Sequence, residues 1–343
     1  MICFFQLAVV FGMAILFVSG VNDLSKLGVT LDDKGQIGHL MDGNCSVQHR
    51  LPLNERVAAG TVIFGKGVKQ RGIDFKKEPS LIFNQIADAD THRGALERCA
   101  ELCSQVSSTV INHPEHVLET SRDHVSSVLQ GIPGVIMPQT RRFRPRSPDE
   151  VFEYAAAEGF NFPFIVRVAG MHAGQSMVRV ETCDNFAEMH ALPFDGRDFY
   201  LTQFVDYKSK DGLYRKTRIA VVDSMPLIRH HLIDSNWKVH ASSLSFMDKH
   251  TSLTDEANSL LADFDRTLGP AVKARVTEIA KRLGLEYFGI DCNINEQGEM
   301  LIFEANANMN ILYNSRKEYQ ECVDVIKKFI LQMIDGRSSQ TIR

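Results

Sequence analysis

The sequence predicts an α/β protein with α+β regions, built from two or three domains. First, the chain has 343 residues, whereas typical domains have roughly 100–200. Second, strand-like and helix-like segments alternate between residues 61 and 114, which is typical of a parallel sheet. Third, an alternating apolar and polar pattern over 286–311 predicts a β-hairpin, and an amphipathic helix lies on either side of it.

The composition narrows the classes of function. Hydrophobic residues make up 44% of the chain and charged residues 23%, as in ordinary soluble globular proteins. The net charge of −4 provides no basic surface field, so a nucleic-acid partner is not expected. The seven cysteines are scattered and do not form the pattern of a secreted disulfide framework. We therefore expect a reduced, cytoplasmic protein, in which Cys99 and Cys103 are small buried side chains rather than a metal or redox pair.

Residues 1–20 argue in the other direction, because they are nearly all apolar. The stretch is long enough for the core of a signal peptide and marginal for a membrane span. However, no Lys or Arg precedes the apolar run, so the charged part of a signal peptide is missing. Three interpretations stay open: an export or membrane segment, a buried strand or helix, and an over-extended start of the reading frame.

The predicted elements begin with a small α/β unit. Short apolar runs at 61–65 and 80–86 predict buried strands, 91–106 predicts a helix, and 108–114 predicts a strand that ends at a proline. The remaining predicted elements are a helix at 121–130, an extended segment at 131–140, a helix at 147–159 capped by Ser147 and Glu150, strands at 162–170, 176–181, 199–207 and 215–233, the hairpin at 286–311, and helices at 272–284 and 322–334.

The C-terminal hairpin holds the most specific pattern. Pairing Ile294 with Leu301 makes one face of the hairpin wholly apolar. The same register places Asp291 directly opposite Glu304, with Asn306 one step along. Two opposed carboxylates repel each other, and three hard oxygen ligands suit a Mg²⁺ ion that is held partly by substrate phosphates. The alternative is that each acid has its own Lys or Arg partner on a solvated sheet face.

A glycine-containing loop follows the strand at 162–170. Gly170 and Gly174 bracket this loop, whose backbone N–H groups can approach phosphates closely. Arg167, on the strand itself, places a permanent cation nearby. The alternative is an ordinary surface turn. Three further basic residues alternate on later strands: Lys216, Arg218 and Arg229.

In this order the patterns resemble the ATP-grasp superfamily over roughly residues 108–312. The most similar branch contains D-alanine–D-alanine ligase, glutathione synthetase and the ribosomal-protein glutamate ligase. FPFIVRVAGMHAGQSMVRV resembles its phosphate-covering loop, YLTQFVD its adenine hinge, and FGIDCNINEQGEMLIFEANAN its metal hairpin. The resemblance implies an ATP-grasp fold with an N-terminal Rossmann-like pre-ATP-grasp domain. The expected parts are an apolar segment at 1–20, the N-terminal domain at 21–117, a central lid domain at 118–198 and a C-terminal domain with the metal site at 199–343.

The resemblance also implies roles for single residues. Arg167 stands where the family usually has a phosphate-binding lysine. Arg218 matches a basic residue that steadies the transferred phosphoryl group, and Arg229 is a second candidate for that catalytic role. The residues that match the magnesium ligands are Asp291, Glu304 and Asn306. The other expected ATP contacts are Gly170, His172, Gly174, Gln203, Phe204, Val205 and Lys216.

Two positions depart from the family pattern. A second lysine is expected on the helix at 121–130, which offers only His124 and Ser127 at suitable places. Near the hinge, the family often has an acidic ribose contact where this chain has Lys216. Both departures concern the ATP contacts, and neither concerns the metal motif.

The implied activity is an ATP- and Mg²⁺-dependent carboxylate–amine ligase that forms an acylphosphate intermediate. Its expected partners are small-molecule or peptide carboxylates and amines. A dimer is left open as the oligomeric state, and a membrane association is left open only through residues 1–20. The alternatives are an ATP-grasp kinase that phosphorylates a small molecule, and a non-catalytic nucleotide-binding module. Weak candidates for acceptor binding are Asp88, Asp90, His92, Arg141, Arg142, Arg144, Arg146, His230, His231 and Trp237.

Overall fold

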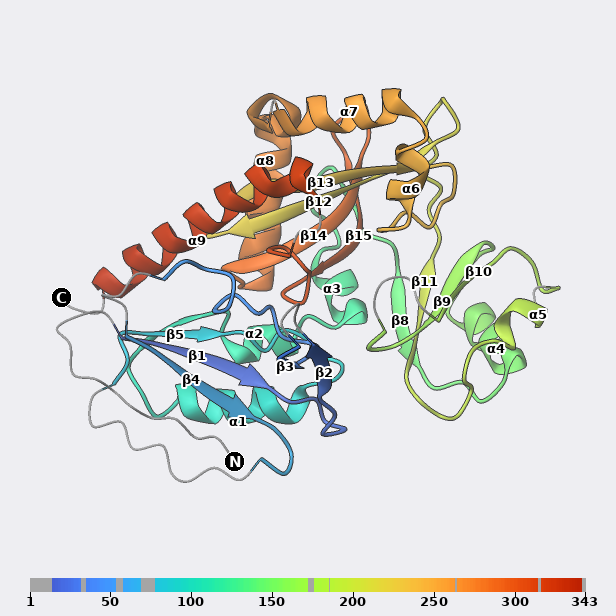
Figure 1. The fold of residues 1–343 in the computed structure, drawn as a ribbon. Helices are drawn as coiled ribbons and strands as arrows, with labels where there is room; N and C mark the ends of the chain where they lie inside the picture. The colour runs from blue at the N-terminus through green and yellow to red at the C-terminus, as the bar shows by residue number, and fades with distance from the viewer. Residues whose placement is uncertain are drawn as a thin grey trace.

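The computed structural model describes residues 14–31, 35–53, 58–68, 78–171, 176–184, 186–262, 264–313 and 316–340. The first of its three larger sheets is parallel, with the strand order β4-β1-β5-β6. Its strands are β1 (Ala14–Gly20), β4 (Ala58–Phe64), β5 (Leu81–Asn84) and β6 (Thr109–Ile111), and α1 (Arg93–Cys103) follows β5. Figure 1 shows this sheet at the lower left of the molecule, with α1 beneath it.

Strand β1 lies inside the parallel sheet, between β4 and β5. Leu16 and Val18 pack in a cluster with Cys99 of α1, while Ile15 and Phe17 pack on the other side. A strand buried on both faces is apolar at nearly every position, which explains the apolar residues of Ala14–Gly20. For Ala14–Gly20 the structure therefore has the buried strand, and the residues before Ala14 lie outside the described part of the chain.

The second sheet is antiparallel, with the order β10-β9-β11-β8. Its elements are β8 (Thr140–Phe143), α4 (Pro148–Ala157), β9 (Phe164–Val168), β10 (Met177–Val180), α5 (Phe186–Met189) and β11 (Phe199–Gln203). The predicted cap of α4 is confirmed, since the Ser147 side chain accepts a hydrogen bond from the Glu150 backbone N–H at 3.3 Å. Phe143, Phe164 and Phe199 form part of this domain's core.

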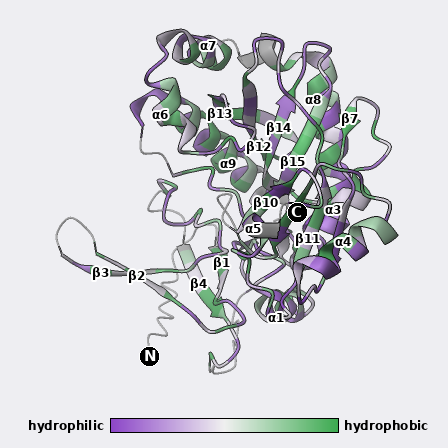
Figure 2. Cartoon of the chain, turned by 90° about the vertical axis from the view of Figure 1, so that its right-hand side faces the viewer, coloured by the Kyte–Doolittle hydropathy of each residue, from purple (hydrophilic) through white to green (hydrophobic). Residues whose placement is uncertain are grey.

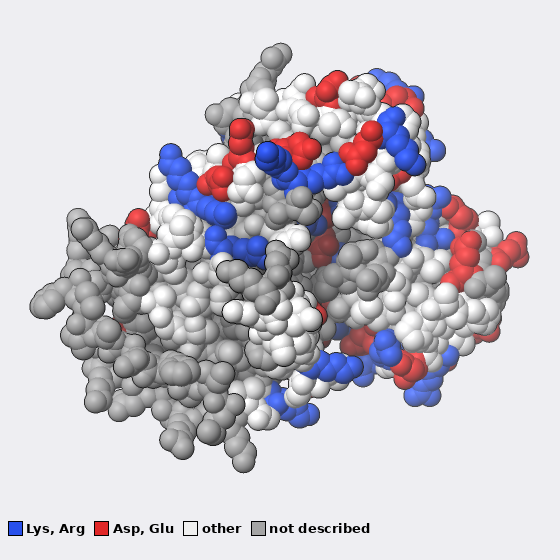
Figure 3. Space-filling view, in the orientation of Figure 1, with Lys and Arg blue, Asp and Glu red and all other residues white. Residues whose placement is uncertain are grey.

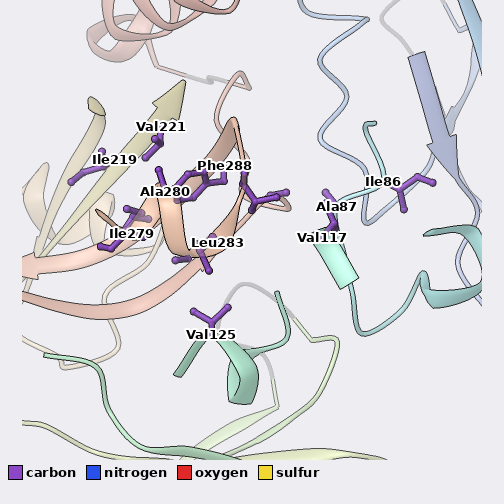
Figure 4. Close-up of a cluster of buried hydrophobic side chains, with 14 of the residues drawn as sticks. Ile86, Ala87, Val117, Val125, Ile219, Val221, Ile279, Ala280, Leu283 and Phe288 are labelled. Carbon is purple, nitrogen blue, oxygen red and sulfur yellow. The ribbon is translucent and has the colours of Figure 1, made fainter. Parts of the chain in front are cut away.

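The third sheet has the order β13-β12-β14-β15-β7 and carries the C-terminal hairpin. Its strands are β7 (Val135–Ile136), β12 (Tyr214–Val222), β13 (Met225–Asp234), β14 (Tyr287–Ile294) and β15 (Met300–Asn306). The helices of this part are α3 (Arg122–Val128), α6 (Ser243–Met247), α7 (Thr251–Ala262), α8 (Phe264–Leu283), the 3₁₀ helix η1 (Lys317–Tyr319) and α9 (Gln320–Gln340). The short helix α2 (Pro114–Leu118) packs instead against α1, beside the N-terminal sheet (Figure 1). Figure 4 shows Ile279 and Leu283 of α8 beside Phe288 of β14 and Ile219 of β12, in one buried cluster.

The register of the C-terminal hairpin agrees with the sequence where the acids lie. Asp291 is paired with Glu304, as predicted. The outer pairing was wrong by one residue, because Ile294 pairs with Met300 and not with Leu301. The pairing shifts between Asp291 and Cys292, where β15 contains one extra residue. A bulge of this kind is not visible in an apolar–polar pattern.

A fourth, two-stranded sheet stands apart from the others. It consists of β2 (Gly28–Leu31) and β3 (Ile37–Leu40), and Figure 2 shows it extending away from the rest of the chain. Among the described residues, no helix is long and apolar enough to cross a membrane.

Candidate functional site

A cavity of about 550 Å³ lies where the second and third sheets meet. Its walls come from strands β9, β11, β12, β13, β14 and β15, from the first turn of α3, and from the loop after β13. The predicted site residues that line it are Arg167, Gln203, Phe204, Val205, Lys216, Arg218, Arg229, Asp291, Glu304 and Asn306. Three others do not belong to this group: Gly170 does not line the cavity, while His172 and Gly174 lie outside the described residues.

Asp291 is buried in the floor of the cavity and is held by two cations. Arg218 donates two hydrogen bonds, from Nε to Oδ1 at 2.7 Å and from Nη2 to Oδ2 at 2.9 Å. Lys216 Nζ donates to Oδ2 at 3.0 Å. Burial tends to raise the pKa of Asp291, but the charges of Arg218 and Lys216 outweigh it and hold the pKa well below its usual range. The side chain is therefore an anion at neutral pH.

Glu304 has a different set of partners. Arg122 forms an ion pair with Glu304 Oε1, and Asn306 Nδ2 donates to the same oxygen at 2.7 Å. Burial tends to raise the pKa of Glu304, but Arg122 and Arg167 together lower it to about 2. Since both contacts fall on Oε1, the second carboxylate oxygen is not engaged by either of them.

The two opposed acids thus each have their own cation, as in the alternative interpretation of the hairpin, but they lie in the cavity wall and not on a solvated sheet face. Within the described residues there is no cluster of three His, Cys, Asp or Glu that could hold a metal ion. The donor set nevertheless fits magnesium chemically. Asp291, Glu304 and Asn306 offer carboxylate and amide oxygens at adjacent positions of two paired strands.

Two arginines in the cavity wall are buried and lack an acidic partner among the described residues. Arg167 on β9 is 9% exposed, and its Nε has no hydrogen-bond partner there. Arg229 on β13 is 4% exposed; it donates to the carbonyls of Ile311 and Tyr313, and its Nη1 is unpartnered. Burial and the nearby Arg122 lower the pKa of Arg167 to about 9, which still leaves it charged at neutral pH. A buried cation without a counter-ion is costly, so both side chains favour an anionic ligand.

The charge of the cavity wall points the same way. The lining residues with a positive charge are Arg122, Arg167, Lys216, Arg218, Arg229, Lys238 and Arg316. Only Asp291 and Glu304 are negative, so seven charges minus two leaves an excess of five. Arg316 has an external partner, Asp248, which reduces the excess to four. The outer face in Figure 3, by contrast, shows acidic and basic side chains interspersed. This excess of positive charge favours an anionic ligand.

Part of the cavity lining is aromatic. Phe204 packs edge-on against Trp237, with 5.7 Å between the ring centroids, and Arg179 lies over both rings. Phe303, at the bulge of β15, packs against Tyr207. These rings line a slot suited to a flat heterocycle.

The hinge segment after β11 borders the same slot. Among the described residues, none forms a hydrogen bond with the backbone of Val205, which lines the cavity. The Gln203 side chain instead donates to the carbonyls of Asn161 and Pro163. The backbone groups of Val205 are thus available to a ligand, whereas the side chain of Gln203 stabilises the adjoining turn.

Arg122 was missed from the sequence. The sequence offers only His124 and Ser127 in place of the family lysine on the 121–130 helix. In the structure, His124 pairs with Glu119 and does not line the cavity. Arg122, in the first turn of α3, lines it and reaches Glu304. The helix dipole disfavours a cation in the first turn of a helix. The position of Arg122 in the sequence was therefore a signal that this residue has another role.

The weak acceptor candidates separate into two groups. His230 and Trp237 line the cavity, and burial together with Arg218 lowers the pKa of His230, so it is neutral at pH 7. His231 instead shares a hydrogen bond with Thr217. The basic run of candidates at 141–146 includes residues of strand β8, and Arg142 and Arg144 both pair with Asp198.

Similarity to known proteins is found in the structure of the chain and not in its sequence. No family model and no curated protein matches the sequence. The D-alanyl-alanine synthetase A of Vibrio cholerae has a TM-score of 0.57 at 13% identity, over 96% of this chain and 100% of that one. The D-alanine–D-alanine ligase of Bacillus anthracis, solved with ATP, has a TM-score of 0.54 at 12% identity, over 96% and 98%. A D-Ala:D-Ser ligase of Enterococcus faecalis has 0.55 at 9%, over 95% and 99%. This chain therefore shares the fold of these proteins.

Proposed function

We propose that this chain, which has the ATP-grasp fold, is a cytoplasmic ATP-dependent ligase that joins a carboxylate to an amine through an acylphosphate. The observation that carries the proposal is the cavity with four excess positive charges beside an aromatic slot. ATP has the matching shape, with a flat base at one end and a chain of phosphates at the other. A smaller anion, such as a simple dicarboxylate, would match the charges but would leave the aromatic slot without a ligand.

The proposed roles follow from where each side chain lies. Val205 offers backbone groups to adenine, and Phe204 contributes to the apolar slot around it. Arg167 and Arg122 neutralise the phosphates from the side of the second sheet and α3. Arg218 and Arg229 add fixed positive charge from β12 and β13, where charge develops during phosphoryl transfer.

Magnesium would be held by the carboxylates of Asp291 and Glu304 and the amide oxygen of Asn306. Such an ion would supply positive charge that neutralises the phosphate oxygens. The protein's own contribution is to hold the reacting groups in place and to keep water away from the acylphosphate.

The proposed reaction balances in two steps. A carboxylate oxygen attacks the γ-phosphorus of ATP, which releases ADP and forms the acylphosphate. The amine nitrogen then attacks the acyl carbon, a C–N bond forms, the C–O bond to phosphate breaks, and the amine loses a proton. No side chain acts as a nucleophile in this scheme.

The decisive experiment counts free phosphate against ADP while pools of carboxylates and amines are offered, with hydroxylamine as a trap. A ligase releases one phosphate for each ADP, and forms a hydroxamate when the natural amine is absent. A stable phosphorylated product without free phosphate would identify the kinase alternative instead. Binding of ATP without any turnover across the pools would favour the non-catalytic module.

A further inference from the structure

An acidic loop of the N-terminal domain contacts both the segment after β15 and the second sheet, outside the cavity itself. This loop, residues 88–92, connects β5 to α1. Asp88 Oδ1 accepts hydrogen bonds from the backbone N–H groups of Asp90 and Thr91, at 2.9 and 3.3 Å, which fixes the turn. Asp88 Oδ2 accepts from Asn308 Nδ2 at 3.4 Å, and the Asn308 backbone N–H donates to Asn306.

Asp90 makes the contact with the second sheet. Its Oδ1 accepts a hydrogen bond from the Tyr200 hydroxyl at 2.7 Å and a charge-assisted bond from Arg142 Nη2. Its Oδ2 accepts from the backbone N–H of Gly170 at 3.2 Å. The Asp90 side chain is only 12% exposed. One carboxylate thus ties the N-terminal domain to β8, to β11 and to the residues that follow β9.

The groups that Asp90 holds belong to one row across the sheet. Tyr200 of β11 is paired with Arg142 of β8 on one side and with Arg167 of β9 on the other. Directly paired residues on neighbouring strands lie on the same face. The guanidinium of Arg142 lies over the Tyr200 ring, 4.9 Å from its centroid. The third member of the row is therefore the buried arginine of the cavity wall.

Gly170 shows how closely the two domains approach. Its φ is +71°, and a Cβ at this position would lie 2.7 Å from Thr91 Cγ2. Only glycine combines this backbone conformation with such an approach. Gly170, predicted from the sequence to touch phosphates, instead contacts the acidic loop of the N-terminal domain.

We propose that Asp90 is a positioning residue for the nucleotide site: from the N-terminal domain it fixes the row Arg142–Tyr200–Arg167 and so holds Arg167 against the cavity. This inference rests on the proposed function, because it takes ATP as the ligand of Arg167. It makes nucleotide affinity depend on a residue that does not line the cavity. Tyr200 carries the effect, since it is bonded to Asp90 and is the register partner of Arg167.

The test measures the Kd of a non-hydrolysable ATP analogue with Asp90→Asn and with Asp198→Asn as the matched control. Both acids pair with Arg142, but Asp198 lies in the second domain and has no bond to Tyr200 or Gly170. We expect Asp90→Asn to weaken binding about tenfold and Asp198→Asn less than about twofold, at similar unfolding midpoints. Tyr200→Phe, which keeps the ring but removes the hydrogen bond, should weaken binding in the same direction.

A double-mutant cycle separates positioning from general damage. In an Arg167→Ala background, Asp90→Asn should change the Kd less than about twofold, because the group that it positions is gone. Wild-type affinity in Asp90→Asn, or an undiminished loss in the Arg167→Ala background, would overturn the inference alone. If the wild-type protein does not bind the analogue, the proposed function itself fails. If Asp90→Asn does not fold, the same cycle with Tyr200→Phe decides the question.

Discussion

Asp291 and Glu304 lie opposite each other in the register, yet neither depends on the other for its charge. Arg218 and Lys216 lower the pKa of Asp291, while Arg122 and Arg167 lower that of Glu304. These cations explain how two buried carboxylates can lie opposite each other and both stay charged. A metal ion would therefore compete with these cations for the two acids, and nucleotide phosphates would compete with the two acids for these cations.

Neutral substitutions at the proposed metal ligands should separate these roles. We expect Asp291→Asn, Glu304→Gln and Asn306→Ala each to lower magnesium-dependent ATP turnover at least about tenfold, or about 1.4 kcal/mol. Asp291→Asn should also lower the free energy of unfolding by roughly 3–5 kcal/mol, because it leaves buried cations without their partner. A magnesium titration of turnover and a urea denaturation curve measure the two effects.

Glu296→Gln is the matched control on the same hairpin. Glu296 pairs with Lys210, and both side chains are largely exposed, so its loss should leave turnover and stability nearly unchanged. Full ATP turnover by Glu304→Gln at low Mg²⁺ would show that the metal assignment is wrong.

Arg167 allows a test of charge against shape. We expect Arg167→Ala to weaken ATP binding at least about tenfold, and Arg167→Lys to be largely tolerated, because a point charge suffices against phosphates unless the contact is bidentate. Calorimetric titration with an ATP analogue measures both variants. Equal losses would mean that guanidinium geometry matters and that the comparison with a phosphate-binding lysine is too loose.

At the scale of elements, α3 delivers a cation to the cavity from its first turn. Arg122 is the first residue of this helix, and it also donates to the carbonyl of Phe303 at 3.3 Å. It therefore supports both the bulge of β15 and the charge of Glu304. The N-cap residue of this helix is Ser121, whose side chain makes no capping hydrogen bond.

Two substitutions on α3 should differ sharply. Arg122→Ala should weaken nucleotide binding about tenfold, since it removes a buried charge from the phosphate end of the cavity. His124→Ala, on the same helix, should change binding by less than about twofold, because His124 pairs only with the exposed Glu119. Similar losses in both variants, measured by the same titration, would place the effect in helix stability instead.

The cap of α4 gives a prediction of stability alone. Ser147→Ala should lower the free energy of unfolding by about 1 kcal/mol, because the Glu150 N–H loses its acceptor. Ser121→Ala is the control, since the same change there removes no capping bond. Urea denaturation measures both, and equal midpoints for the two variants would contradict the assigned cap.

At the scale of the whole molecule, β1 joins two hydrophobic clusters. One face packs toward α1 and the other toward α9, so this strand ties the N-terminal sheet to the C-terminal helix. Phe17 is fully buried and stacks on Phe83, 5.8 Å between centroids.

Removal of residues 1–20 should therefore abolish soluble, folded protein, because the parallel sheet loses the strand between β4 and β5. Phe17→Ala is the graded counterpart and should cost roughly 3–5 kcal/mol. Soluble yield and circular dichroism measure the first variant, and a denaturation curve the second. A deletion variant that stays folded and binds ATP would instead support an export signal or a misplaced start of the reading frame.

The sequence by itself determined the features that arise from a short repeat along the chain. Strand alternation places Asp291 opposite Glu304, and the Ser147 cap depends on a residue three positions away. Such patterns arise from the geometry of one strand or one helix turn, so they can be recognised without knowing the rest of the chain.

Only the tertiary structure decided which cations meet those acids and which segments lie inside. Arg122 reaches Glu304, and Asp90 reaches Tyr200, across long separations in the sequence. Within the apolar run at the start of the chain, Ala14–Gly20 forms a buried strand because β4 and β5 pair with it from both sides. Ion pairs and burial depend on which elements pack together, and no local period carries that information.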